Sequence, residues 1–495
     1  MHELSDLFDS AAARSLDARA SALAGDDGQT LMAAAGDAAW RCLGQRWPDA
    51  RRVCVLVGAG NNGGDGVVLA LHALQAGYHV TVMGLSGKPP ATALAAWAAS
   101  EFLAAGGVID TFSGALPEAD VLVDALFGTG LQDAPRADAA ALIEAMNAHP
   151  APVLALDVPS GVDADRGSAP GAAVRATLTL QFIVAHRGLY TGEGLEHAGE
   201  RRLAPLPVPD SVRAQVPAVA ALWQQERLAA LLKPRGLNAH KGSSGHVLCV
   251  GGNHGSGGAL LLTAHAALRT GAGLASLATR AEHVAAALAR LPEAMCHAVD
   301  GDAPLQDLLQ RASVVAIGPG LGQDDWARGL WGGVRGSGKP LIVDADALNL
   351  LAQDPQPLPQ AVLTPHPGEA ARLLQSTTAA VQADRFAAAA ALADRFHAVV
   401  VLKGAGSLIA APGRCPAVIA AGNPGMAVGG MGDLLTGVIA ALRAQGLQPF
   451  DAAAGGALLH GLAGDVAARD GARGLLPTDL LAPLRRLCNP ELRHV

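Results

Sequence analysis

The stretch that decides the fold of this chain is GNPGMAVGGMGDLLTGVIAAL, residues 422–442. Its first half is rich in glycine and its second half carries apolar residues at helical spacing, so we predict that a helix begins near Asp433. A glycine turn that leads into a helix leaves backbone N–H groups without partners, and the helix dipole adds partial positive charge there. This combination predicts an anion site suited to phosphate. Asp433 stands at its edge, where a simple capping residue would also stand.

Outward from this stretch, the second half of the chain alternates short apolar segments with helical ones. A glycine turn at 251–258 is followed by a segment, 259–270, with helical spacing. This alternation predicts a parallel α/β domain. The segments expected to contain strands are 238–250, 314–322, 341–346, 361–369 and 399–407.

The first half shows the same alternation. Residues 10–43 are rich in alanine and are expected to be helical, and the apolar segment 51–57 is expected to be a buried strand. A polar glycine turn, GAGNNGGDG, follows this strand, and we expect a helix over 67–74 after it. A plain connection does not need Asn-Asn-Gly-Gly-Asp, so we favour a ligand-binding loop. Further strands are expected at 79–84, 121–126 and 153–158.

Oxygen-bearing side chains follow several of these strands. Asp124 lies at the end of one expected strand, and Asp157 and Ser160 follow another. Since the carboxyl ends of parallel strands meet at one edge of a sheet, Asn62, Asp124 and Ser160 could together bind a hard monovalent cation. The alternative is that Asp124 only caps the turn after its strand.

Length and composition divide the chain into two domains. With 495 residues it exceeds the size of one core, and the proline-rich segment 205–217 is the best candidate for an extended linker. We therefore expect an α/β protein with a Rossmann-like αβα domain at 1–210, a linker at 211–220 and a second domain at 221–495. Each domain is expected to have a parallel sheet.

The charge and cysteine content restrict the partners. A net charge of −8, with 16% charged residues, argues against nucleic acid and anionic membranes as main partners. No apolar segment is long enough to cross a bilayer, and the acidic start MHELSDLFDS does not resemble a signal peptide. The six cysteines are scattered without a CxxC pair, as expected in a reducing compartment. We expect a cytoplasmic protein.

The motifs of the second half resemble those of a known family. KGSSGH, GGNHGSGGA, GPGLG, DADALN, TPHPGE, LKGAGS and GNPGMAVGGMGD are similar to the ADP/ATP-dependent NAD(P)H-hydrate dehydratases, which have a ribokinase-like fold. The resemblance spans about residues 220–490. It implies adenine-nucleotide contacts by Lys403, Gly404, Ala405, Gly406, Ser407 and Gly432. It implies contacts to the hydrated nicotinamide nucleotide by Ala259, Gly322, His366 and Asp433. Val428 stands where a serine is common.

From the residues alone, two of these assignments keep an alternative. His366 could be a turn histidine, although the flanking prolines in TPHPGE would present its ring rigidly. Lys403 could be a solvated residue at the end of a strand.

The motifs of the first half resemble the NAD(P)H-hydrate epimerase domain. GNNGGDG, DALFGTGL, LDVPSGVDADRG and TLTLQFIVAHRGLYTGEG carry the likeness over about residues 1–210. It implies that potassium is held by Asn62, Asp124 and Ser160. It implies that the hydrated nucleotide is held by Asn61, Asn62, Gly63, Gly64, Asp65, Gly128, Thr129, Gly130, Leu131, Gln132, Asp133, Ala134 and Asp157. The chain departs from the family at Ala33, within LMAAAG, and at His186, where a lysine is common.

Together these resemblances imply a bifunctional enzyme of nicotinamide nucleotide repair, an isomerase and a lyase. Asp433 would be the general base that helps the substrate hydroxyl attack a phosphoryl group of ADP or ATP, with Mg²⁺ and the glycine amides spreading the charge. Asp157 would handle the proton in epimerisation of the R and S forms.

Two other functions remain open at this stage. The second domain could be an ordinary small-molecule kinase, and the first a non-catalytic binding module. We expect a homo-oligomer acting on small molecules. The preference for ADP or ATP, and any transfer of intermediates between the sites, do not follow from the sequence.

Overall fold

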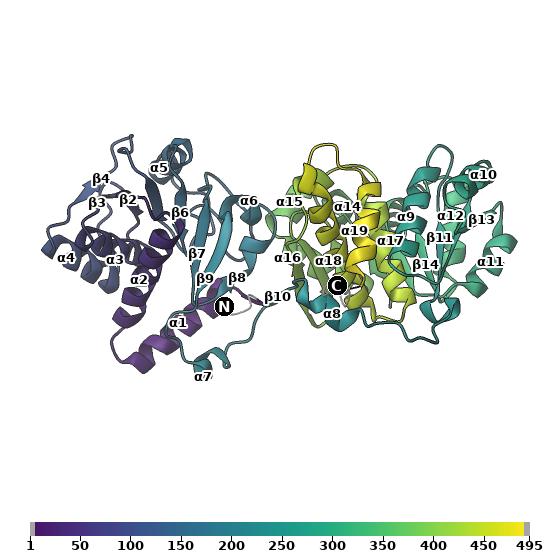
Figure 1. The fold of residues 1–495 in the computed structure, drawn as a ribbon, viewed down its shortest axis with the longest axis horizontal. Coiled ribbons are helices and arrows are strands. Elements are labelled where there is room, and N and C mark those ends of the chain that lie inside the picture. Colours follow the sequence, from purple (N-terminus) through teal and green to yellow (C-terminus); the bar gives the residue numbers. More distant parts are fainter. Residues whose placement is uncertain (1–4, 490–495) are drawn as a thin grey trace. The chain divides into compact units, whose positions relative to one another are not determined.

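The computed structural model describes residues 5–489, and the chain divides into two compact units between Ala221 and Leu222. Each unit contains a central sheet with helices packed on it (Figure 1). Within residues 5–489, every helix is too short or too polar to pass through a lipid bilayer.

A fully parallel seven-stranded sheet forms the centre of the first unit. From one edge to the other its strands are β4 (Ile109–Thr111), β3 (His79–Gly84), β2 (Arg52–Val57), β5 (Val121–Ala125), β6 (Val153–Leu156), β7 (Leu178–Phe182) and β9 (Glu200–Ala204). The strand order reverses direction between β2 and β5, so loops after these two strands diverge and leave a crevice, as in Rossmann-like folds.

Alternating side chains of this sheet enter two separate cores. Val53, Val55 and Val57 of β2 pack with the helices on one face, whereas Cys54 and Leu56 pack on the other. The first face is covered by α1 (Ser10–Ala24), α2 (Gln29–Arg46), α3 (Asn61–Gln75) and α4 (Ala93–Ala104), and the second by α5 (Ala137–Ala148). This three-layer αβα arrangement follows from burial on both faces of a parallel sheet.

Two sequence expectations need correction in this unit. The helical segment 10–43 is two helices, because Gly25 and Gly28 adopt left-handed backbone angles between them. Helix α3 begins at Asn61, six residues earlier than expected, so the polar glycine segment forms its first turn rather than a loop before it. A Cβ on Gly63 would lie 2.0 Å from the carbonyl oxygen of Gly58, so glycine is what allows the helix to begin this close to the strand.

Short elements complete the first unit. They are β1 (Asp6–Phe8), β8 (Ala185–His186), η1 (Arg187–Tyr190), α6 (Gly194–Ala198), α7 (Asp210–Arg213) and β10 (Ala220–Leu222). Strand β1 pairs with β8 in parallel and with β10 in antiparallel register.

The expected linker is not extended throughout. Helix α7 lies inside it, and the Arg213 guanidinium donates hydrogen bonds to the carbonyl oxygens of Ile183, Pro205 and Val208. These backbone contacts tie the segment to the first unit.

The sheet of the second unit is parallel over seven strands and antiparallel at one edge. The parallel strands lie in the order β13 (Met295–Ala298), β12 (Leu274–Thr279), β11 (His246–Val250), β14 (Val314–Ile317), β15 (Leu341–Val343), β16 (Val362–Leu363) and β17 (Val399–Leu402). The antiparallel strands are β18 (Ser407–Ala411) and β19 (Arg414–Ile419). The expected parallel sheet is therefore confirmed, with one antiparallel edge where the glycine loop after β17 closes a hairpin instead of leading to a helix.

Helices cover the two faces of this second sheet (Figure 1). The longer ones are α9 (Gly257–Arg269), α10 (Ala281–Arg290), α11 (Asp302–Arg311), α12 (Asp325–Arg335), α13 (Ala345–Gln353), α14 (Pro367–Leu374), α16 (Arg385–Phe396), α17 (Met431–Ala444) and α18 (Pro449–Ala467). The shorter ones are α8 (Glu226–Leu231), η2 (Lys241–Ser244), α15 (Thr378–Ala383), η3 (Pro424–Met426), η4 (Ala468–Asp470), η5 (Pro477–Leu480) and α19 (Leu481–Leu487).

Helix α17, which the first-quoted stretch forms, is central to this unit. A Cβ on Gly437 would lie 2.0 Å from the Thr263 carbonyl oxygen, so glycine lets α17 pack directly on the backbone of α9. Leu434, Val438 and Ile439 are fully buried. This packing fixes the N-terminus of α17 at the edge of the unit where strands β14, β15 and β17 end.

Candidate active sites

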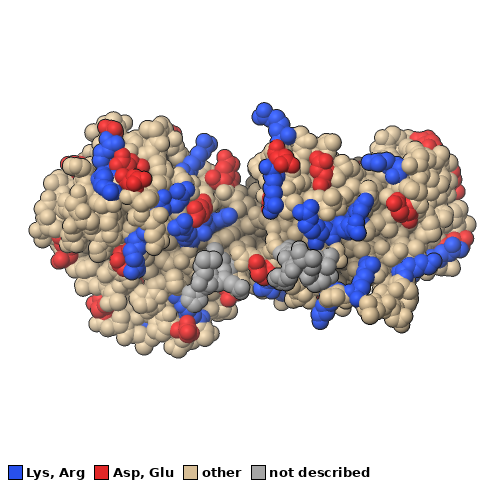
Figure 2. All heavy atoms as spheres, in the orientation of Figure 1, with Lys and Arg blue, Asp and Glu red and all other residues tan. Residues whose placement is uncertain are grey.

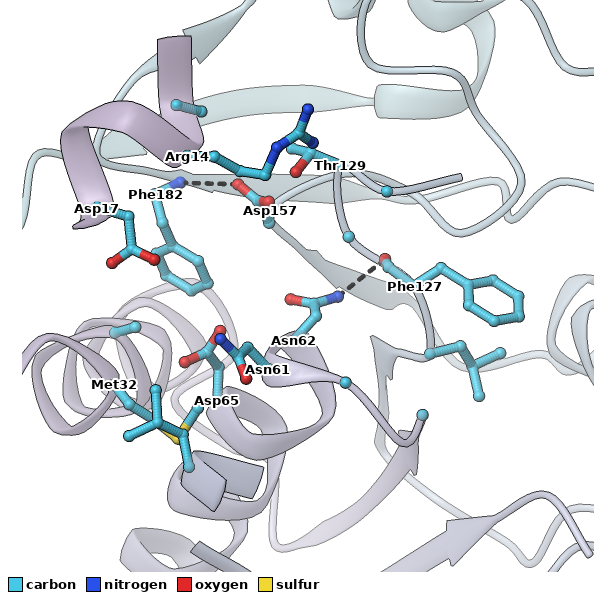
Figure 3. Close-up of a pocket in the computed structure, with 18 of the residues that line it drawn as sticks. Arg14, Asp17, Met32, Asn61, Asn62, Asp65, Phe127, Thr129, Asp157 and Phe182 are labelled. Carbon is cyan, nitrogen blue, oxygen red and sulfur yellow. Dashed lines mark hydrogen bonds between the residues drawn. The ribbon is translucent and has the colours of Figure 1, made fainter. Parts of the chain in front are cut away.

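The first unit contains a cavity of about 570 Å³ at the carboxyl ends of its parallel strands. Loops after β2, β5 and β6 line it, together with residues of α1, α2 and α3 (Figure 3). This is the edge at which open parallel sheets bind ligands.

The structure brings most of the predicted substrate residues of the first unit to this cavity. Those that line it are Asn61, Asn62, Asp65, Gly128, Thr129, Gly130, Leu131 and Asp157. The predicted residues Gly63, Gly64, Gln132, Asp133 and Ala134 do not line it. A Cβ on Gly64 would lie 2.6 Å from the Met32 methyl group, so this glycine serves the packing of α3 on α2.

Asp157 is held in an unusual conformation at the cavity wall. Its φ is 65°, a left-handed value that is uncommon outside glycine and that often marks functional positions. Its Oδ1 lies 2.9 Å from Nε2 of His186 and accepts a hydrogen bond from the Phe182 amide at 3.3 Å. His186 is 1% exposed, so this chain places a buried imidazole behind the carboxylate.

The three predicted cation ligands lie close together, and two of them, Asn62 and Ser160, bind the backbone of Phe127. Ser160 donates to Asp124 through its hydroxyl at 2.6 Å and through its amide at 2.7 Å, and its Oγ accepts a bond from the Phe127 amide. The Asn62 amide group donates to the Phe127 carbonyl oxygen at 2.9 Å. Its Oδ1 is buried without a hydrogen-bond partner among residues 5–489.

A buried acceptor with nothing to accept from is the kind of atom that a cation satisfies. Burial raises the pKa of Asp124 to about 6, despite the hydrogen bonds from Ser160, and a bound cation would favour the ionised form. Asp124 also accepts from the Leu126 amide at 3.3 Å, so the turn-capping alternative describes a real contact and both roles are compatible.

Two charged cavity residues on helix α1 were not predicted. Arg14 and Asp17 line the cavity, one turn apart. Burial, and then the charge of Asp157, raise the pKa of Asp17, while burial and the same charge raise the pKa of Asp65 well above its usual value. Since α1 lies outside every motif and reaches the cavity only through tertiary packing, no local signal could have marked these residues.

The candidate site of the second unit lies at the N-terminus of α17. Gly430, with φ 93°, is the N-cap and makes no side-chain capping bond, and α17 begins at Met431. Asp433 therefore lies in the first turn and does not cap the helix, which corrects the simple alternative. Its carboxylate has no hydrogen-bond or ion-pair partner within the part of the chain that the structure describes, whereas its carbonyl oxygen accepts a bond from Thr263.

A buried lysine stands beside this turn. Lys403 Nζ lies 2.7 Å from Oδ1 of Asp344 and 3.8 Å from Oε2 of Glu369, and Thr436 donates to the other Asp344 oxygen at 2.8 Å. The Lys403 side chain is 18% exposed, so it is not a solvated strand end. Burial lowers the pKa of Lys403, but the carboxylates of Asp344 and Glu369 outweigh it and raise the pKa.

Asp433 lies in the field of these groups. Burial, and then the charge of Asp344, raise its pKa to about 6, and Lys403 offsets part of the shift. A Cβ on Gly432 would lie 3.2 Å from Lys403 Nζ, so glycine keeps the space between the helix start and the ammonium group open. A carboxylate poised near neutral pH beside a cation and free helix amides can accept a proton next to bound phosphate.

The remaining predicted residues surround this point. His366 is the N-cap of α14: its Nδ1 accepts from the Gly368 amide at 3.0 Å, and its ring remains 51% exposed. Its Nε2 lies 3.4 Å from Oε1 of Glu369, so both ring nitrogens have a neighbour in the turn although half of the side chain is exposed. Gly322, with φ 74°, donates its amide to Asp346 at 2.8 Å. Ala259 lies in the first turn of α9.

The predicted nucleotide residues Lys403, Gly404, Ala405, Gly406 and Ser407 belong to the β17–β18 hairpin. The buried guanidinium of Arg385 holds this hairpin from beneath, because it donates to the carbonyl oxygens of Leu402, Lys403 and Gly406 at 3.3–3.4 Å.

Several supporting residues of the second site were not predicted. Asp344 and Glu369 stood inside the quoted motifs DADALN and TPHPGE without an assigned role, and Arg385 and Asp465 lay outside every motif. Asp465 of α18 accepts bonds from the Gly422 amide and the Asn423 side chain, both at 3.0 Å. Asp344 and Glu369 could have been singled out as carboxylates within these motifs, but only the fold shows what they contact.

Comparison with known proteins agrees with this division. A family model described as NAD(P)H-hydrate dehydratase matches residues 247–486, and one described as YjeF-related protein N-terminus matches residues 28–188. The bifunctional NAD(P)H-hydrate repair enzyme Nnr of Escherichia coli K12 is 45% identical over 464 residues, covering 93% of this chain and 90% of that protein. Its Coxiella burnetii counterpart is 46% identical over 462 residues, with 93% and 95% covered.

Among solved structures, similarity is found for part of the chain. The ADP/ATP-dependent NAD(P)H-hydrate dehydratase from Bacillus subtilis, co-crystallized with ATP/Mg²⁺, is 31% identical with a TM-score of 0.50, covering 54% of this chain and 96% of that one. A ribokinase-like superfamily protein from Enterococcus faecalis V583 is 31% identical with a TM-score of 0.51, covering 54% and 95%. The fold classes expected for the two domains, Rossmann-like and ribokinase-like, are thereby confirmed.

These relatives do not favour the alternative of a small-molecule kinase joined to a non-catalytic module. The similarity extends along nearly the whole chain and includes both units, in the same order. The chain belongs to the family of bifunctional NAD(P)H-hydrate repair enzymes.

Proposed function

We propose that the first unit interconverts the R and S forms of hydrated NADH and NADPH, and that the second dehydrates the S form at the expense of ADP or ATP. The observation that carries the second assignment is Asp433 at the start of α17, a carboxylate without a partner among residues 5–489. Burial raises its pKa to about 6, and it lies beside the buried Lys403. The enzyme is thus an isomerase and a lyase on one chain.

Dehydration begins with the substrate hydroxyl, which is a poor leaving group. Asp433 takes the hydroxyl proton as the oxygen attacks the terminal phosphoryl group of the nucleotide. When the nucleotide is ADP, the product is AMP. The free amides at the start of α17 face the developing negative charge. The ring nitrogen lone pair then expels phosphate, and loss of a proton from the neighbouring ring carbon restores the dihydronicotinamide.

Mg²⁺ fits this second site as an ion that arrives with the nucleotide. No group of three or more His, Cys, Asp or Glu side chains within the described residues forms a metal cage of its own. Magnesium is commonly bound through substrate phosphates with only one or two carboxylates, so such a cage is not required. When bound, the ion would neutralise phosphate charge.

In the first unit, Asp157 is positioned to exchange the proton of the substrate hydroxyl. The nitrogen lone pair expels the hydroxyl as water, and water returns to the opposite face of the ring. His186 and the Phe182 amide orient the Asp157 carboxylate, and the unshared side of this carboxylate is directed to the cavity. His186 thus places a hydrogen-bond donor behind the Asp157 carboxylate.

The donor set in the first unit also fits K⁺. Oxygen atoms lie close together near the backbone of Phe127, on the side chains of Asn62, Asp124 and Ser160. The buried Asn62 Oδ1 has no hydrogen-bond partner among residues 5–489. One carboxylate with neutral oxygens suits a weakly held monovalent cation. When bound there, the ion would fix the loops after β2, β5 and β6, which carry substrate contacts.

We also propose a cytoplasmic homo-oligomer. The six cysteines are thiols rather than disulfides, which fits a reducing compartment. Acidic and basic side chains are interspersed on the faces visible in Figure 2, and neither sign covers a continuous surface, as expected for a protein whose partners are small molecules. Light scattering of the purified chain would establish the oligomeric state.

The decisive experiment incubates purified enzyme with separated R and S hydrates of NADH and with ADP or ATP. We expect nucleotide-dependent recovery of dihydronicotinamide absorbance from the S form, with free phosphate released in equal amount. We expect nucleotide-independent exchange of R and S. A stable phosphorylated product without recovered NADH would instead indicate a kinase.

A further inference from the structure

Helix α1 supplies a carboxyl group to the first cavity for which the reaction described so far has no use. Asp17 lines this cavity together with Asp157, and the two side chains enter it from separate elements, helix α1 and the loop after β6 (Figure 3). Because α1 lies outside the motifs of the first unit, its contribution comes from the tertiary structure alone.

Helix α1, which carries Asp17, is held at its core face and at its N-terminus. Leu16 and Ala20 pack α1 into the core, and the N-terminus of the helix is held where Ser10 donates its amide and hydroxyl to Asp165 at 2.6 and 2.7 Å. Asp9 caps the helix by accepting from the Ala12 amide. Asp17 is thus held on the cavity side of a fixed helix.

Asp17 has no structural partner to explain it. Within residues 5–489 its carboxylate makes no hydrogen bond or ion pair, although it is half-buried. A half-buried carboxyl group without a partner is costly, and such groups gather at functional sites. The other titratable groups that line the cavity are Arg14, Asp65, Lys88, Asp157 and His186.

Epimerisation requires proton transfer on both faces of the nicotinamide ring. The hydroxyl leaves as water from one face, which needs a proton donor there. Water then adds to the opposite face of the iminium cation, which needs a proton acceptor there. With the ring held in place, Asp157 can serve one face only, and a second group must serve the other.

Two carboxyl groups besides Asp157 could provide that second group. Burial and the charge of Asp157 raise the pKa of Asp65 well above its usual value, which favours its protonated form and a role as hydrogen-bond donor. The pKa of Asp17 is raised by burial and, less, by the charge of Asp157. An acid carboxyl on one side of a ring and a base carboxylate that activates water on the opposite face form an established catalytic arrangement.

We propose that Asp17 is the second proton-transfer residue of the epimerase and serves the ring face opposite to Asp157. In one direction, protonated Asp17 gives its proton to the hydroxyl oxygen as the C–O bond breaks, and the nitrogen lone pair forms the C=N bond. Water adds from the other face, its oxygen forms the new C–O bond, and the Asp157 carboxylate takes its proton. The reverse reaction exchanges the roles, so the pair carries one proton in every active state.

The test compares Asp17→Asn and Asp17→Glu in the full-length chain, with Asp37→Asn as the matched control. Asp37 is an aspartate of α2 in an exposed ion pair with Arg41 and does not line the cavity. The assay follows R/S exchange of hydrated NADH at equilibrium over a range of pH, with dehydration by the second unit of the same molecules as an internal check.

We expect Asp17→Asn to lower kcat for exchange by about 10²–10⁴-fold with KM changed less than about threefold, as for loss of a general acid–base group. The parent profile should be bell-shaped, because one carboxyl of the pair must be protonated and the other ionised. In the asparagine variant, the pH profile of the exchange rate should keep only one of its two limbs. Asp17→Glu should recover part of the rate, and Asp37→Asn should match the parent.

A near-parental kcat in Asp17→Asn, a retained bell-shaped profile, or a change in KM alone would overturn the proposal. If the asparagine variant loses the fold of the first unit, the glutamate variant tests the proposal instead. It keeps a carboxyl group at this position, so one limb of the pH profile of the exchange rate must shift. The inference rests on the proposed epimerase role of the cavity. Asp157→Asn measured in parallel separates the two: parental exchange in that variant would contradict the role of Asp157 itself, whatever Asp17 does.

Discussion

At the scale of single residues, Asp433 links the helix start to the chemistry of the second unit. Gly430 caps α17, so the Asp433 carboxylate is not needed for the fold. Asp433→Asn keeps the size of the side chain and removes a half-buried charge. We expect an unchanged or slightly higher unfolding temperature and a loss of dehydration of about 10²–10⁴-fold, with R/S exchange unaffected. Near-parental dehydration would require a different base.

The pH dependence of the second activity belongs to the same residue. Its pKa of about 6 lies above the ordinary carboxyl value, so the folded protein gains a proton as pH falls through 6. Ionisation above that pH therefore costs the folded state stability, yet it produces the base. We expect kcat/KM for dehydration to rise through pH about 6, as measured at saturating nucleotide. The range from pH 5 to 7 covers about one pH unit on each side of this pKa. A kcat/KM that stays constant over this range would contradict the assignment of Asp433 as the base.

At the scale of elements, helix α18 holds the loop that precedes the phosphate site. Asp465 accepts two hydrogen bonds from residues 422 and 423, and Asn423 in turn accepts from the Gly425 amide at 3.0 Å. Loss of hydrogen bonds to a charged group costs about 1.5–3 kcal/mol each, so we expect Asp465→Ala to loosen this loop. The KM for ADP should rise about tenfold or more, with kcat changed less.

The control for this variant lies on the same helix. Asp451 forms an ion pair with Arg414 at 3.1 Å that is partly exposed, so Asp451→Asn should have little effect. Equal KM values for ADP in the parent and in Asp465→Ala would show that the loop keeps its conformation without the clamp.

The loops after β5 and β6 carry the proposed potassium site. An ion that binds only the folded state stabilises it in proportion to ln(1 + [L]/Kd), so K⁺ should raise the unfolding temperature of the first unit above that in choline chloride of equal ionic strength. Asp124→Asn should abolish the K⁺ effect, and Asp138→Asn, a surface aspartate of α5, should retain it. If K⁺ raised the unfolding temperature equally in both variants, Asp124 would not be a ligand of the ion.

At the scale of the whole molecule, the two units should fold and act separately. Each has its own sheet, core and candidate site, and the division falls between Ala221 and Leu222. We expect the fragments 1–221 and 222–495 to be soluble, with R/S exchange in the first and nucleotide-dependent dehydration in the second. An insoluble or inactive second fragment beside an active full chain would contradict independence.

The exact end of the first fragment is a sharper test. Ala220 and Ala221 pair with Leu7 and Asp6, and Arg213 binds the carbonyl oxygens of Ile183 and Pro205. A fragment ending at residue 210 lacks both contacts, so it should unfold at a lower temperature than 1–221. Equal unfolding temperatures would mean that this segment is only a tether.

Local sequence patterns were enough to predict several of the elements, the two α/β folds and the family. Buried strands, glycine turns and helical spacing are local patterns, so residues 79–84 and the start of α17 were predicted within two residues. The tertiary structure alone decided the antiparallel edge at β18 and β19, the early start of α3, and the arrival of Asp17 and Arg385 at the two sites. Local patterns record only which face of an element is buried, whereas these contacts depend on which distant segments that face meets.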